Sequence, residues 1–92
     1  MYIVVSYDVS DDHRRARLAR LLLEYGRRVQ KSVFECVIDE RLFLQMRGGV
    51  EREVDHVTDS VRFYFLCRRC VPAIQIVGWG TVSDEGDSVV IV

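Results

Sequence analysis

The order in which strand-like and helix-like patterns alternate along the chain most restricts its fold. Residues 2–7 (YIVVSY) are a run of β-branched and aromatic side chains, which predicts a buried strand ending at Asp8. Residues 12–25 then carry apolar side chains at i, i+3, i+4 and i+7, the spacing of an amphipathic helix. Residues 9–12 (VSDD) supply its capping candidates, and Gly26 is the expected stop.

The rest of the chain continues this alternation. A second helix is predicted at about residues 40–56, capped by Asp39, and Gly48-Gly49 in its middle predicts a kink or fraying because glycine is a poor helix former. The remaining segments are extended in character, and strands are predicted at residues 28–30, 33–38, 61–67, 73–79 and in the terminal run 89–92.

The resulting order, βαββαβ with extra strands, predicts an α+β fold of the ferredoxin-like sandwich type, with both helices on one face of the sheet. A chain of 92 residues with 49% hydrophobic side chains fits one such domain, residues 1–92. Four apolar residues at the end need a partner strand. We therefore expect residues 81–92, as extra C-terminal strands, to complete the sheet of a partner protomer in a two-fold homodimer.

The formal net charge of −1 argues against nucleic acid as a partner, but the charge is unevenly distributed. Residues 13–31 carry a net charge of +6, almost entirely from arginine. Arginine pairs well with phosphate, so this stretch predicts a sequence-independent nucleic-acid surface. The alternative is an ordinary solvated helix face. The residues proposed to form the basic surface are Arg14, Arg15, Arg17, Arg27 and Arg28.

Asp8 is the candidate for chemistry, because it stands where the first strand ends and the next loop begins. Mg²⁺ takes carboxylate oxygens, and a two-fold axis that placed Asp8 against its symmetry mate would supply two of them. Alternatively, Asp8 caps the following helix or pairs with an arginine.

Two cysteines, Cys67 and Cys70, have CxxC spacing. Four ligands are needed for a tetrahedral zinc site, and the sequence lacks a second such pair, so this is half a site. We expect small buried or half-buried thiols here.

The chain resembles the CRISPR-associated endoribonuclease family, the smaller of the two core spacer-acquisition proteins. The resemblance rests on residues 2–26 (YIVVSYDVSDDHRRARLARLLLEYG) and 28–36 (RVQKSVFEC), and it continues through SVRFYFLC and the CxxC pair. One family-typical position differs, since Phe65 stands where many members have proline.

This resemblance implies a ferredoxin-like homodimer in which Asp8 of both protomers shares one Mg²⁺ and acts catalytically in phosphodiester cleavage of RNA or DNA. It also implies a complex with the adaptation integrase, in which the dimer carries DNA. Phe34 is expected to stack on a base or to pack. The positions that match family residues linked to activity are Tyr7, Arg15, Arg17, Arg28 and Phe34. Of these, the resemblance implies that Tyr7 is catalytic together with Asp8.

Three functions follow as hypotheses: a Mg²⁺-dependent endonuclease, a catalytically silent DNA-bridging subunit, and a small-molecule or regulatory ferredoxin-like module. The first two bind nucleic acid, whereas the third does not. The chain has no long apolar run and no basic signal-like start, so we expect no membrane association and a cytoplasmic location.

Overall fold

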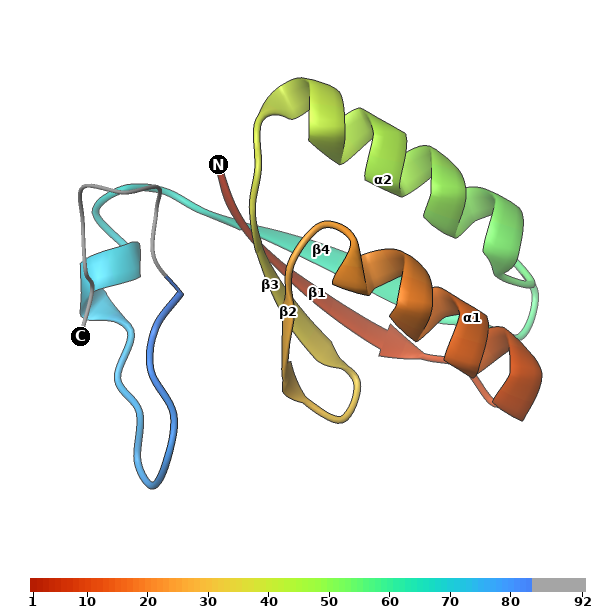
Figure 1. Ribbon diagram of the computed structural model, residues 1–92, viewed down its shortest axis with the longest axis horizontal. Coiled ribbons are helices and arrows are strands. Elements are labelled where there is room, and N and C mark those ends of the chain that lie inside the picture. The colour runs from red at the N-terminus through yellow and green to blue at the C-terminus, as the bar shows by residue number, and fades with distance from the viewer. Residues whose placement is uncertain (84–92) are drawn as a thin grey trace.

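A computed structural model of the chain describes residues 1–83, in which four strands and two helices form two layers (Figure 1). Both helices lie on the same side of the sheet. The elements are β1 (Tyr2–Asp8), α1 (Asp12–Leu23), β2 (Arg27–Gln30), β3 (Val33–Val37), α2 (Glu40–Glu53), β4 (Ser60–Leu66) and a short 3₁₀ helix, η1 (Val71–Ala73). Within residues 1–83, neither helix has the length and apolar character needed to cross a membrane.

The sheet has the strand order β2-β3-β1-β4, and every neighbouring pair is antiparallel. The central strand β1 pairs with β4 along its whole length, from Tyr2 opposite Leu66 to Asp8 opposite Ser60. This order and the two helices on one face confirm the predicted ferredoxin-like fold.

Side chains of β1 alternate between the two faces of the sheet, as strand geometry requires. Ile3, Val5 and Tyr7 are buried in the core beneath the helices, where they meet the apolar stripes of α1 and α2. Ser6 and Asp8 therefore belong to the opposite face, which the helices leave open. The side chains of the two expected catalytic residues, Tyr7 and Asp8, thus lie on opposite faces of the sheet.

Part of this second face is covered by the chain itself. Tyr2 packs with Val71 and Val82 in a small second core, so that the segment after β4 folds back over the sheet near the start of β1. Arg27 fixes the end of this segment by donating from Nε to Ser83 Oγ at 2.7 Å, and Ser83 donates to Glu35 Oε1 at 2.6 Å. The half of the face around Ser6 and Asp8 lies outside this second core.

The prediction of a strand at residues 73–79 is wrong. Pro72 lies inside the short 3₁₀ helix that begins at Val71. Gly78 and Gly80 have φ values of +97° and +127°, which interrupt an extended backbone. Of the expected partner-completing segment, residues 81–83 pack on this chain's own sheet. The terminal run 89–92 lies outside the described residues.

Two glycines lie where a neighbouring segment packs too closely to leave room for a side chain. A Cβ on Gly26 would lie 2.2 Å from the backbone oxygen of Glu35, so glycine lets the end of α1 cross directly over β3. Gly26 follows the helix as predicted, but its φ is not positive, so it is not a left-handed stop. Gly49 faces Leu21 of α1, and α2 continues through both of its glycines, so the predicted kink is absent.

Candidate functional site

Asp8 is the last residue of β1 and is exposed on the open face of the sheet. It borders a shallow hollow lined by residues of β1 and β4: Ser6, Tyr7, Asp8, Ser60, Arg62 and Tyr64. Asp11, three residues further on, caps α1 by accepting from the backbone nitrogen of Arg14 at 2.8 Å. Because Asp11 fills the capping role, the carboxylate of Asp8 is not required for it.

Arg62 and Tyr64 complete this hollow, and neither was among the residues expected from the sequence. Arg62 lies opposite Ser6 in the β1–β4 register, so it is a diagonal neighbour of Asp8. Its Nη1 is 3.4 Å from the hydroxyl oxygen of Tyr64, a long contact between two exposed side chains. The signal was present in the period-two pattern of β4, which places Ser60, Arg62 and Tyr64 on one face.

Tyr7 forms a separate cluster with Arg28 and Phe34 on the helix-covered side. The ring of Tyr7 stacks on that of Phe34 with centroids 6.2 Å apart, and its hydroxyl donates to the carbonyl of Lys31 at 3.3 Å. The Arg28 guanidinium lies 5.5 Å from the Phe34 ring centroid and 3.4 Å from the Tyr7 hydroxyl. Arg28 is exposed, so it alone of the three presents a free edge to solvent.

Phe34 is a packed core residue. Its exposed fraction is 0%, and it lies in the core beneath the helices. Of the two expected roles, only packing fits a fully buried ring.

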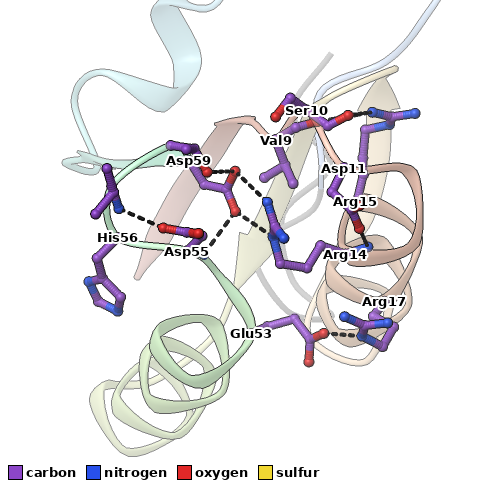
Figure 2. Close-up of polar contacts among 12 residues, drawn as sticks. Val9, Ser10, Asp11, Arg14, Arg15, Arg17, Glu53, Asp55, His56 and Asp59 are labelled. Atoms are coloured by element: carbon purple, nitrogen blue, oxygen red, sulfur yellow. Dashed lines mark hydrogen bonds and ion pairs between the residues drawn. The ribbon is translucent and has the colours of Figure 1, made fainter.

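Arg14 makes a two-point contact with Asp59, in the loop that joins α2 to β4 (Figure 2). Arg14 Nε lies 2.8 Å from Asp59 Oδ2, and Nη2 lies 3.2 Å from Oδ1. This hydrogen bonding, more than any other cause, lowers the pKa of Asp59 to about 2. Arg14 is therefore engaged in holding α1 against the loop, and only its remaining donors are available to a phosphate.

Arg15 and Arg17 point in other directions from the same helix start (Figure 2). Arg15 donates from Nη1 to the carbonyl of Val9 at 3.0 Å and from Nη2 to Asp12, and so braces the loop that follows Asp8. Arg17 reaches across to Glu53 at the end of α2. The predicted basic surface is thus a set of arginines with separate partners, of which Arg17, half exposed, is the most accessible from α1.

The metal-binding capacity of one chain is limited. Among residues 1–83, no three His, Cys, Asp or Glu side chains come together in a group that could hold an ion. Asp8 presents an exposed hard oxygen ligand of the type that Mg²⁺ accepts. One carboxylate per chain fits a site that is completed by a second copy, by water and by phosphate oxygens.

The fold and this face define an α+β protein of the ferredoxin-like class, with an acidic and a basic side chain exposed on the uncovered part of its sheet. The chain belongs to the family described as CRISPR associated protein Cas2, whose sequence profile matches residues 1–74. A Chloroflexus aurantiacus protein named CRISPR-associated endoribonuclease Cas2 1 is 38% identical, with 100% of both chains covered. A Thermus thermophilus protein named CRISPR-associated endonuclease Cas2 2 is 52% identical over 87% of this chain and 84% of its own.

Solved structures agree with this assignment. The crystal structure of Streptococcus pyogenes Cas2 matches with a TM-score of 0.76 and 34% identity, covering 85% of this chain and 100% of that one. A chain in a partial Cas6-RT-Cas1–Cas2 complex matches with a TM-score of 0.66 and 29% identity, covering 83% of this chain and 89% of that one. The expected family is therefore confirmed.

Proposed function

We propose that this chain is a CRISPR adaptation protein that works as a homodimer, binds nucleic acid, and hydrolyses phosphodiester bonds of single-stranded RNA or duplex DNA with Mg²⁺. The observation that carries the proposal is the position of Asp8, exposed on the open half of the sheet beside Arg62. A site that needs two carboxylates and finds one per chain is completed by a two-fold axis at this face.

Three side chains of the hollow, Asp8, Arg62 and Tyr64, have a direct role in this proposal. Asp8 of each protomer holds the ion, and bound Mg²⁺ would lower the pKa of water and neutralise charge on the phosphate. Arg62 binds a non-bridging phosphate oxygen, since its guanidinium lies diagonally from Asp8 on the same face. Tyr64 orients that guanidinium through its hydroxyl. Arg15 keeps the loop after Asp8 in place and so acts as a positioning residue.

Tyr7 has a supporting place in this proposal. Its buried ring and its bond to Lys31 fix the end of β1 from the core side, and they keep Arg28 at the surface. Arg28 and Arg17 then bind the nucleic-acid backbone away from the reacting phosphate. The names of the two relatives, an endoribonuclease and an endonuclease, support nuclease chemistry and leave RNA and DNA both open as substrates.

The decisive experiment compares Asp8→Asn with Glu40→Gln, a control that neutralises an exposed carboxylate on α2. Labelled single-stranded RNA and duplex DNA are incubated with each protein and Mg²⁺, and oligomeric state is measured by light scattering. We expect Asp8→Asn to slow cleavage by about 100-fold or more, a loss typical of removing one electrostatic contributor. The dimer should persist. Cleavage by Asp8→Asn at the wild-type rate, or a monomeric wild-type chain, contradicts the proposal.

The silent scaffold remains a second candidate, because one similar structure is a Cas1–Cas2 assembly. In this case the dimer carries DNA for the adaptation integrase, and Asp8 is dispensable. A spacer-integration assay with the integrase separates the two: a scaffold loses integration on substitution of Arg15 and Arg17 but keeps it in Asp8→Asn. A wild-type chain that also fails to cleave RNA and DNA favours the scaffold.

A further inference from the structure

The CxxC pair forms a close dithiol that the proposed nuclease does not use. Cys67 Sγ and Cys70 Sγ are 3.2 Å apart. Both residues are exposed, so the prediction of buried or half-buried thiols is wrong. A disulfide needs a sulfur separation of about 2.05 Å, so the two sulfurs must approach each other by only about 1 Å to bond.

The backbone has already made the turn that a disulfide would require. The nitrogen of Cys70 donates to the carbonyl of Cys67 at 2.9 Å, and the nitrogen of Val71 donates to the same oxygen at 3.2 Å. Val71 is buried beside Tyr2, which anchors the far end of the turn to the sheet. Since the chain is ordered before any bond forms, closing the ring costs little further backbone entropy.

The two thiols are not equivalent. A hydrogen bond from the Cys70 thiol, and further ones from the backbone nitrogens of Cys70 and Arg69, lower the pKa of Cys67. The same thiol contact raises the pKa of Cys70. The lowered pKa favours the thiolate form of Cys67, and the 3.2 Å separation of the two sulfurs places Cys70 to attack it in turn.

The third cysteine differs from this pair because it is buried. Cys36 is fully buried in the core, and burial raises its pKa to about 11. A buried, protonated thiol is unreactive, which makes Cys36 an internal reference within the same molecule.

We propose that Cys67 and Cys70 are a thiol–disulfide exchange site, with Cys67 as the attacking and Cys70 as the resolving residue, and low-molecular-weight disulfides such as glutathione disulfide as the oxidant. The Cys67 thiolate attacks one sulfur of that disulfide, its S–S bond breaks, and one glutathione thiolate leaves. Cys70, on losing its proton, attacks Cys67 Sγ, and the second glutathione thiolate leaves. Two protein thiols are oxidised by two electrons, and the oxidant becomes two thiols that take up both protons.

A zinc site is the competing use of the same residues. It needs four ligands, and the described residues place no third Cys, His, Asp or Glu with this pair. Within one chain the donor set therefore fits disulfide exchange better than metal binding.

The sequence around the pair provides a clean assay. Trypsin cleaves after Arg62, Arg68 and Arg69, and no Lys or Arg follows. Peptides 63–68 and 70–92 thus stay joined only by a Cys67–Cys70 disulfide. The full-length protein is incubated with glutathione disulfide, its free thiols are blocked in denaturant, and it is digested without reductant and analysed by mass spectrometry.

We expect the joined peptide to appear with oxidant and to vanish with reductant, while Cys36 remains blocked as a free thiol. Cys70→Ser should trap glutathione on Cys67, at least about tenfold faster than Cys67→Ser traps it on Cys70. Cys36→Ala, the control, should still give the joined peptide. The proposal is overturned if both thiols stay reduced, if the disulfide joins two chains, if the two single variants are trapped equally fast, or if added Zn²⁺ protects both thiols stoichiometrically.

Discussion

The guanidinium of Arg14 holds the carboxylate of Asp59 through two hydrogen bonds, of 2.8 and 3.2 Å, and joins the start of α1 to the loop before β4. The side chain of Asp59 has an exposed fraction of 0%, whereas that of Arg14 is partly exposed. This carboxylate also accepts from the backbone nitrogen of Asp55 at 2.9 Å. An arginine that the sequence assigned to nucleic acid thus has a structural partner 45 residues away.

Asp59→Asn is expected to destabilise the protein, lowering the thermal midpoint by several degrees. The change removes the charge that the guanidinium faces and replaces one acceptor oxygen with a donor group, while the covered site stays the same size. The matched control is Glu51→Gln, because the Arg47–Glu51 pair lies between exposed side chains on α2 and contributes little. Equal midpoints for the two variants would show that the Arg14–Asp59 contact carries no special stability.

Stability should also fall with acid in a defined range. The pKa of Asp59 is about 2 in the folded chain against an ordinary value of 3.8, so the folded state favours the charged form. The resulting stabilisation is complete above the ordinary value and is lost as pH falls through the folded pKa. Urea unfolding from about pH 5 down to about pH 2 measures it. The loss of stability over this range should be smaller in Asp59→Asn, and an unchanged profile would contradict the assignment.

The sequence predicted the fold well because burial dictates its pattern. The β-branched and aromatic run at residues 2–7 predicted β1, and the helical spacing of apolar residues predicted α1. One side of that strand and the apolar side of α1 meet in the core between the sheet and the helices. The prediction failed at residues 73–79. An apolar run there looked like a strand, but Pro72 and two glycines with positive φ shape the backbone differently.

The candidate site was less predictable, because side-chain partners depend on packing between distant segments. Nothing near Arg14 in the sequence points to Asp59, and nothing near Phe34 says that its ring is fully buried. Arg62 could have been found, since the alternation in β4 places it on the same face as Ser60 and Tyr64. Which arginine is free to bind phosphate was decided by the side-chain partners, not by the charge count.

Gly26→Ala is expected to cost about 2 kcal/mol or more of unfolding free energy, because its Cβ would lie 2.2 Å from a backbone oxygen and 2.6 Å from Cys36 Sγ. Gly48→Ala is the control. Its Cβ would meet only the flexible end of Arg52 at 3.5 Å, so the higher helix propensity of alanine should add about 0.5–1 kcal/mol. Urea unfolding of both variants checks this. If Gly26→Ala is as stable as the wild type, α1 does not cross β3 as closely as the structure has it.

Arg17 should contribute to nucleic-acid binding through charge alone, because its half-exposed side chain can exchange the partly exposed Glu53 for a phosphate oxygen at little cost. For duplex DNA, removing one arginine–phosphate pair reduces the slope of log K against log salt by about 1. Arg17→Ala should therefore give a shallower slope and weaken binding equally for unrelated sequences. Arg47→Ala is the matched control, since it removes another exposed arginine paired with a glutamate on a helix, outside the basic stretch. Fluorescence anisotropy at several salt concentrations measures both slopes. Equal slopes for the two variants would place the nucleic-acid surface elsewhere, and a wild-type slope near zero would favour a small-molecule or regulatory module.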